Sequence, residues 1–106
     1  MKANVKIADY VYDRYNSTKL EKLKNELQRL FNEAHTRSIQ EFPEEGIEVS
    51  IIMSAKYQKL YIKCENWGNY QSVGEFEDII KEALENRCFE ETETEWEDDS
   101  FKIWFE

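Results

Sequence analysis

The fold is decided by the stretch IEVSIIMSAKYQKLYIKC, residues 47–64. Apolar and polar residues alternate on both sides of residues 55–58, the pattern of two strands that bury one face and are joined by a turn. Pairing Met53 with Leu60 keeps all seven alternating apolar residues on one face, whereas a slip of one residue would turn one strand's set outward. The sequence therefore predicts an antiparallel hairpin. Ile52 and Tyr61 then share its opposite face, where either a helix covers them or they form part of a contact surface.

Before this hairpin, two helices are predicted. Residues 4–15 place Val5, Ile7 and Val11 in one arc of a helical wheel, with lysines and aspartates opposite, which indicates a helix. Thr18-x-x-Glu21 is a capping box that begins a second helix, whose apolar residues recur at three- and four-residue spacing and whose limit is Pro43. The apolar positions of this second helix are Leu20, Leu23, Leu27, Leu30, Phe31 and Ala34.

After the hairpin, a third helix and a second hairpin are predicted. Ser72-x-x-Glu75 is a second capping box, and it opens a helix whose apolar face runs from Phe76 to Cys88. Residues 90–106 alternate again on both sides of Asp98-Asp99, and a loop with an even number of residues keeps every glutamate out of the core. This pairing sets Trp96 against Phe101 and Thr94 against Ile103 on the buried side, and it puts Glu91, Glu93, Glu95 and Glu97 outward with Lys102 and Trp104.

The expected fold class is α+β: an antiparallel sheet built from two hairpins with three helices, in the order α-α-β-β-α-β-β. With 106 residues, 41% of them hydrophobic, the chain has apolar material for one core and too little length for two ordinary domains. We therefore expect residues 1–106 to form a single domain. The pattern leaves open the strand order, and whether the two hairpins share one sheet.

The charge of the chain is acidic and uneven. Fourteen bases and 23 acids give a net charge of -9 at pH 7, which argues against direct binding of nucleic acid or an anionic membrane surface. Residues 1–40 hold eight bases and five acids, whereas residues 41–106 hold six bases and 18 acids. Residues 90–99 contain seven acids and no base, a density that suits either a solubilising edge or contact with a basic partner.

Location and thiol chemistry follow from what the sequence lacks. No apolar run approaches the roughly 20 residues that span a bilayer, and no signal-peptide pattern opens the chain. We therefore expect a cytoplasmic protein without membrane contact. Cys64 and Cys88 occupy apolar positions without CxxC spacing or companion histidines, so buried, reduced thiols are expected.

The sequence contains no recognisable catalytic set. Its single histidine, His35, falls at the edge of a helix's apolar arc, without a Cys or Ser in a nucleophile setting nearby. The three glycines form no phosphate-binding pattern, and the acidic run lacks the alternating Asp/Asn and Gly of a calcium loop. We therefore expect no enzyme activity, no cofactor and no metal.

The glutamates of the last hairpin suggest a phosphate mimic. Every second residue of a strand stands about 6.6–6.8 Å from the next, close to the roughly 6.8 Å advance over two steps of one DNA strand. We hypothesise that this face, extended by Asp98, Asp99 and acids of the third helix, occupies a Lys/Arg groove that normally holds nucleic acid. Specific binding also needs apolar anchors, for which Trp104 is the first candidate and Trp67 and Tyr70 the second. Core packing is the alternative for each of the three.

In its shortness, its aromatics amid acids and its row of Glu91, Glu93, Glu95 and Glu97 before Asp98-Asp99, the chain resembles the small acidic α+β inhibitors of phages and mobile elements. This class includes anti-CRISPR proteins and DNA mimics. The resemblance implies a stoichiometric inhibitor that occludes a nuclease or nucleic-acid-binding surface, such as the entry groove of a CRISPR effector. Because no family motif is involved, the resemblance carries over no functional residue.

Other functions fit the same features. An immunity protein or antitoxin would apply the same acidic face to a basic toxic nuclease, so that only the partner differs. A homodimeric accessory protein would instead bring Ile52, Tyr61 and Trp104 against a symmetric copy. Bases of the second helix, such as Lys19 and Arg29, would touch nucleic acid in a further alternative, but the glutamates between them favour a solvated face.

Overall fold

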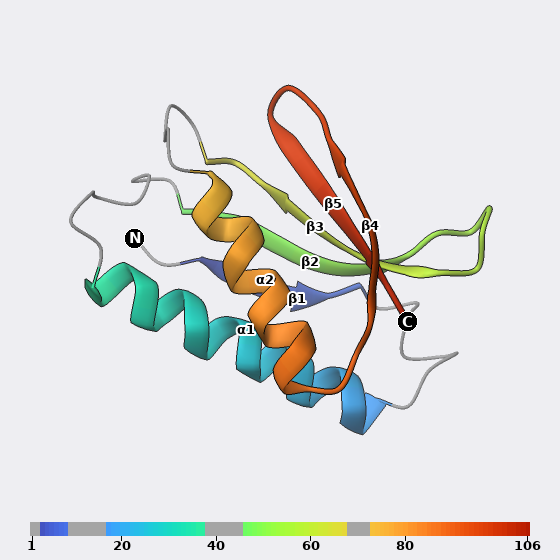
Figure 1. The fold of residues 1–106 in the computed structure, drawn as a ribbon, viewed down its shortest axis with the longest axis horizontal. Helices are drawn as coiled ribbons and strands as arrows, with labels where there is room; N and C mark the ends of the chain where they lie inside the picture. The colour runs from blue at the N-terminus through green and yellow to red at the C-terminus, as the bar shows by residue number, and fades with distance from the viewer. Residues whose placement is uncertain (1–2, 9–16, 38–45, 68–72) are drawn as a thin grey trace.

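The computed structural model describes residues 3–8, 17–37, 46–67 and 73–106. Within these ranges the chain is α+β and forms five strands and two helices (Figure 1). One sheet has the strand order β1-β2-β3-β5-β4, so the two predicted hairpins share it. Because β1 runs parallel to β2, the sheet is mixed, and the prediction of an antiparallel sheet is wrong in this respect. In chain order the elements are β1 (Asn4–Ile7), α1 (Ser17–Arg37), β2 (Glu48–Met53), β3 (Leu60–Glu65), α2 (Gly74–Asn86), β4 (Glu91–Trp96) and β5 (Ser100–Phe105).

The central hairpin, β2 and β3, has the predicted register. Met53 lies opposite Leu60, and Ile52 lies opposite Tyr61 on the other face. The seven apolar residues assigned to the buried face are all buried. Because β3 also pairs with β5, the hairpin has the rest of the sheet on both sides, and its apolar face lies at the centre of the core.

The predicted helix over residues 4–15 is wrong for residues 4–7. These residues form β1, which runs parallel to β2 and pairs Val5 with Val49 and Ile7 with Ile51. Val5 and Ile7 are buried and Asn4 and Lys6 are exposed, a period of two that is typical of a strand, since residues two apart do not share a face of a helix. Pairing with the edge of β2 favours the strand, and no local sequence pattern predicts this pairing. The remainder of the predicted helix, residues 9–15, lies outside the described residues.

The other two predicted helices are confirmed with different ends. α1 begins at Ser17, one residue before the predicted cap, and its predicted extension beyond residue 37 lies outside the described residues. α2 begins at Gly74 with Val73 in the N-cap position and no side-chain cap, whereas the predicted cap, Ser72, lies outside the described residues. The described chain therefore has two of the three expected helices.

The end of α2 contradicts the predicted burial of one of the two cysteines. The Cys88 N–H donates to the Glu85 carbonyl (3.1 Å) and the Phe89 N–H to the Leu84 carbonyl (2.9 Å), which is a Schellman motif. Cys88 therefore follows the helix rather than extending it, with a φ of 61°, and its side chain is exposed instead of buried. Cys64 is buried as predicted, and its burial raises the pKa of the thiol.

Both helices pack on the same face of the sheet, which makes two layers (Figure 1). Phe31 of α1 contacts Phe76 of α2, with ring centroids 6.0 Å apart, so the helices also pack against each other. No helix of the described residues covers the opposite face of the sheet. The largest fully buried side chains are Phe31, Phe76, Phe101, Phe105, Leu20, Leu23, Leu27, Ile47, Ile51, Ile62, Ile80 and Leu84.

Candidate protein-binding surface

The hairpin of β4 and β5 forms with the even loop that was predicted. Trp96 lies opposite Phe101 and Thr94 opposite Ile103. The Glu97 N–H donates to the Ser100 carbonyl at 2.8 Å, which places Asp98 and Asp99 at the tip. The hairpin therefore has its apolar side toward the helices and its acidic side toward the uncovered face of the sheet. Because α2 packs on the apolar side, its acids do not extend the acidic face, and that part of the prediction is wrong.

A β-bulge corrects the predicted row of four glutamates. The register shifts between Glu91 and Glu93, so Glu93 lies opposite Trp104 whereas Glu91 lies opposite the buried Phe105. Glu91 therefore points to the helix side of the sheet, where its carboxylate is 3.6 Å from the Lys81 ammonium of α2. A bulge inserts one extra residue and turns the side chains on one side of it to the other face. Regular alternation in the sequence hides this insertion.

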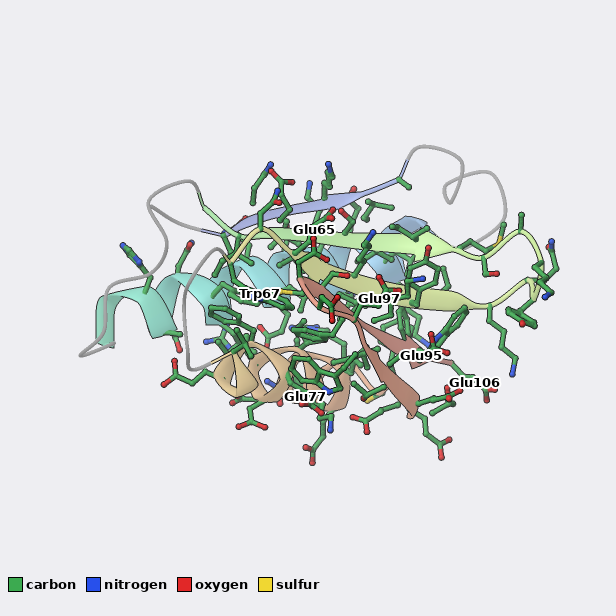
Figure 2. All side chains as sticks on the ribbon, turned by 90° about the horizontal axis from the view of Figure 1, so that it is seen from above. Glu65, Trp67, Glu77, Glu95, Glu97 and Glu106 are labelled. Atoms are coloured by element: carbon green, nitrogen blue, oxygen red, sulfur yellow. The ribbon has the colours of Figure 1, made fainter. Side chains whose placement is uncertain are left out.

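The remaining acids form a surface that we call the acidic edge, defined as Glu93, Glu95, Glu97, Asp98 and Asp99. All five are exposed. Glu97 is 3.7 Å from the Lys102 ammonium and accepts a hydrogen bond from the Ser100 hydroxyl (3.2 Å), whereas none of the other four has an ion-pair partner among the described residues. Figure 2 shows Glu95 and Glu97 along the hairpin. Negative charge on this edge is therefore only partly neutralised within the chain.

Beside the acidic edge lies a group of rings that we call the aromatic stack, defined as Tyr57, Tyr61 and Trp104. The Trp104 ring is 4.7 Å from that of Tyr61 and 5.9 Å from that of Tyr57, and Lys102 lies 5.3 Å over Tyr61. Trp104 is half-buried here, and its indole N–H has no hydrogen-bond acceptor among the described residues. Tyr57 is 58% exposed. The most exposed ring of the surface is therefore Tyr57, in the loop between β2 and β3, which the sequence analysis missed because that residue falls in a turn.

The acidic edge and the aromatic stack border one groove. Its volume is about 320 Å³. Glu93 and Glu95, which have no ion pair among the described residues, line it together with the rings of Tyr57 and Trp104. A cationic group in the groove would meet carboxylates and ring faces, with the one ammonium of Lys59 beside them. The groove is lined by Tyr57, Lys59, Thr92, Glu93, Glu95 and Trp104.

The second pair of predicted anchors is not on this surface. Trp67 is only 7% exposed and stacks on Phe101, with ring centroids 5.6 Å apart, so it is a core residue and the prediction of a contact role is wrong. Figure 2 shows it in the layer between the sheet and the helices. Its burial follows from contacts with Phe101 and with Trp96 (ring centroids 6.3 Å apart), both in the last hairpin, so only the assembled fold creates it. Tyr70 lies outside the described residues.

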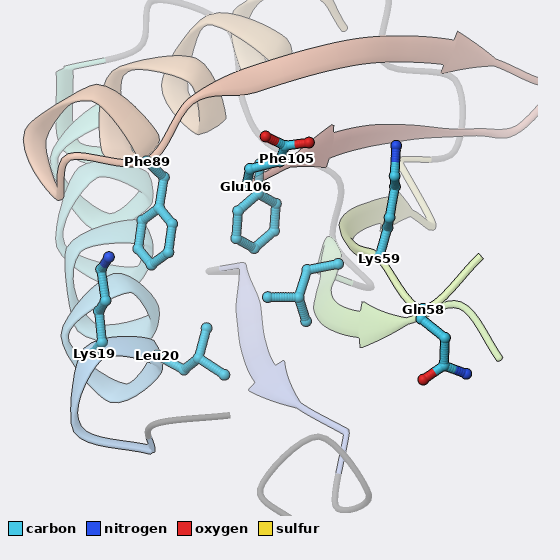
Figure 3. Close-up of a pocket in the computed structure, with 8 residues that line it drawn as sticks. Lys19, Leu20, Gln58, Lys59, Phe89, Phe105 and Glu106 are labelled. Carbon is cyan, nitrogen blue, oxygen red and sulfur yellow. The ribbon is translucent and has the colours of Figure 1, made fainter. Parts of the chain in front are cut away.

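A second pocket lies at the opposite end of β5 from the acidic tip (Figure 3). It has a volume of about 430 Å³, and its walls include Leu20, Phe89 and Phe105, with Lys19 4.6 Å over the Phe89 ring. Glu106 is the one carboxylate among the described residues that line it, so the pocket does not offer the pair of carboxylates that acid–base chemistry needs. Its chemistry is that of apolar contact with two lysines at the rim.

One carboxylate among the described residues is buried, and it serves the fold. Glu26 accepts hydrogen bonds from Arg29 (2.8 and 2.9 Å) and from Asn86 of α2 (2.7 Å), so it links the two helices. The bond from Arg29 is the main reason that the pKa of Glu26 is lowered to about 2, and burial opposes the shift. A buried charge with full hydrogen bonding is a structural group, in contrast to the unpaired carboxylates of the acidic edge.

The described residues contain no cluster of three His, Cys, Asp or Glu side chains that could hold a metal ion. None of their helices is long and apolar enough to cross a membrane. His35 is partly buried on α1, which fits the expected helix position.

No family model, no curated protein and no solved structure matches this chain. The candidate surface therefore stands on its own geometry: three outward glutamates, two aspartates at a tip, and a stack of three rings beside them.

Proposed function

We propose that the chain is a stoichiometric binding protein whose β4–β5 hairpin occludes a basic, nucleic-acid-binding surface of a partner protein. The observation that carries this proposal is the row of Glu93, Glu95 and Glu97 on one exposed face, beside the rings of Tyr57 and Trp104. Carboxylates at alternate strand positions attract a row of Lys or Arg side chains, and the rings add the apolar contact that makes the attraction specific.

The distribution of charge supports this mode of binding. The net charge of the chain is -9, and the acidic edge adds two aspartates at an exposed tip to its glutamates. Such a field steers a basic partner toward the hairpin and weakens as salt screens it. The bulge leaves three rather than four carboxylates in line, so the mimic of a phosphate track spans the distal part of β4 only.

Two kinds of partner have the required chemistry. A CRISPR effector with a basic entry groove would make the chain an anti-CRISPR inhibitor of the phage-encoded type. A toxic nuclease would make it an immunity protein or antitoxin, and the same carboxylates and rings would serve. The proposal assigns no catalytic residue, cofactor, metal or membrane contact, and it places the protein in the cytoplasm with its partner.

The proposal is tested by capture of the partner on the tagged chain. Lysates of cells that express candidate CRISPR effectors and nucleases are washed at low and high salt, and retained proteins are identified by mass spectrometry. We expect one basic nucleic-acid-binding protein that is retained at high salt and displaced by its own DNA or RNA.

A matched pair of variants makes this test specific. Glu93→Lys/Glu95→Lys is expected to abolish capture, whereas Glu82→Lys/Glu85→Lys, which makes the same change in net charge on exposed positions of α2, is expected to keep it. Equal capture by both variants would overturn the proposal. A protein that retains only second copies of itself, with a mass that rises with concentration, would favour the homodimeric accessory protein instead.

A further inference from the structure

We infer that the partner engages the chain by adding a strand to the free edge of β4, an inference that rests on the proposed function. β4 is the last strand of the order β1-β2-β3-β5-β4, with β5 on one side and no strand of the described residues on the other. Five of its six residues are exposed. The described part of the chain therefore leaves this edge open.

The backbone of β4 has hydrogen-bonding groups directed to that edge. Glu97 is hydrogen-bonded to Ser100, and antiparallel pairs alternate between hydrogen-bonded and non-hydrogen-bonded positions. Thr94 and Trp96, opposite Ile103 and Phe101, therefore fall at non-hydrogen-bonded positions. The N–H and C=O groups of these two residues point away from β5, and a row of such groups is a template for an added strand.

The side chains of β4 determine what kind of strand fits. Glu93 and Glu95 lie on the outward face of this edge, whereas Thr94 and Trp96 lie on the face toward the helices. Trp96 packs on Phe101 at 4.6 Å but remains 46% exposed, so part of its ring is available to a neighbour. An added strand places one set of alternate residues beside the glutamates and the other set beside Thr94 and Trp96. The occupant is therefore an extended segment in which Lys or Arg alternates with threonine or apolar residues.

Charge excludes a second copy of β4 as the added strand. It also makes β4 the better of the two sheet edges for a basic strand. Pairing of two β4 strands would bring two rows of glutamates together, and like charges in adjacent strands are destabilising. At the other edge, β1 has only four residues, and its Lys6 is ion-paired with Glu48 (3.5 Å), so this edge does not present the unpaired carboxylates that β4 presents. A basic strand therefore meets favourable charge at β4 alone among the described edges.

The probe is the capped peptide Lys-Thr-Lys-Val-Lys-Thr-Lys, titrated into the isotope-labelled full chain and followed by NMR. We expect saturable binding and slower hydrogen exchange at the Thr94 and Trp96 amides. Two matched peptides have the same charge and carry backbone N-methyl groups. In the first peptide these groups are on the lysines, and in the second they are on the threonines and the valine. Only the peptide methylated on the residues that face β4 is expected to bind about tenfold more weakly, because it loses its hydrogen bonds to the edge.

A variant of the chain tests the same contact from the other side. Thr94→Pro removes an N–H that points out of the sheet, a position where an edge strand tolerates proline, and it is expected to weaken peptide binding about as much as methylation does. Circular dichroism and the remaining NMR signals check that this variant folds. Should Thr94→Pro disturb the fold, the methylated peptides still decide the question on the unaltered chain.

Strand addition is overturned if all three peptides bind equally without protection of Thr94 and Trp96, or if none of them binds. Equal binding would leave charge attraction, and with it the proposed function, intact. The proposed function fails separately, when the Glu93→Lys/Glu95→Lys variant still captures the partner protein.

Discussion

The central hairpin of β2 and β3 and the edge hairpin of β4 and β5 have the same kind of alternating sequence, yet only the central one buries the apolar side of both strands. Phe101, Ile103 and Phe105 of β5 are buried like the residues of β2 and β3, whereas Trp96 of β4 is 46% exposed. Position in the sheet accounts for this difference, since β3 and β5 have a strand on each side and β4 has one. Alternation determines which residues share a face, and the place of the strand determines how far that face is covered.

The largest effect that this comparison predicts is on core truncation. Ile62→Ala in β3 removes a fully buried side chain and is expected to lower the free energy of unfolding by about 2–5 kcal/mol. Thr94→Ala, on the same face but in β4, is expected to change it by no more than about 0.5 kcal/mol. Urea unfolding of both variants measures the difference, and equal losses would mean that β4 is covered as well as β3 is.

The next effect concerns charge and pH. Glu26 has a pKa of about 2, below its ordinary 4.5, so the unfolded chain takes up a proton first as the pH falls. Its stabilisation is therefore present above about pH 4.5 and is lost between pH 4.5 and 2. Glu26→Gln is expected to cost about 1–2 kcal/mol at pH 7 and to make the decline over that pH window shallower.

The control for Glu26 is a carboxylate of the edge hairpin. Glu95→Gln removes an exposed charge that has no ion pair among the described residues. The free energy of unfolding is therefore expected to change by at most about 0.5 kcal/mol, both at neutral and at acidic pH. Urea unfolding at pH 7 and pH 3 compares the two variants. A loss for Glu95→Gln as large as that for Glu26→Gln would contradict the assignment of one carboxylate to the fold and the other to the surface.

A smaller effect is expected where the chain enters the edge hairpin. Cys88 has a φ of 61°, a conformation that glycine adopts without the steric cost of a side chain. Cys88→Gly is therefore expected to stabilise the fold by about 0.5–1 kcal/mol, as a higher midpoint of thermal unfolding. Cys88→Ala, which keeps the Cβ, is the control and should show no gain.

The smallest expected effect tests the bulge. Glu91→Gln breaks an exposed ion pair with Lys81 and should cost at most about 0.5 kcal/mol. It should also leave affinity for the captured partner unchanged, whereas Glu95→Gln, three pairs further along β4, should reduce it. Equal loss of affinity in a titration would place Glu91 in the outward row after all.

On the candidate surface, local patterns placed Glu93, Glu95, Glu97 and the aspartate tip correctly, because the even loop and the period of two leave one arrangement with an apolar core side. They misplaced Glu91, because the bulge adds one residue to β4 while the alternation of the sequence stays regular across it. They also missed Tyr57, because its contact with Trp104 joins two segments that are far apart in the chain.

By itself, the sequence determined the register of the central hairpin and of the last hairpin as far back as Glu93, the buried faces of α1 and α2 and the acidic character of the last hairpin. Each of these depends on periodicity within a short segment, which burial of one face enforces. The tertiary structure alone decided that residues 4–7 are a strand, that β5 rather than β4 lies beside β3, and that Trp67 is buried. The physical reason is that these outcomes depend on hydrogen bonds and contacts between distant segments, whose free energy outweighs the weak local preferences of a few residues.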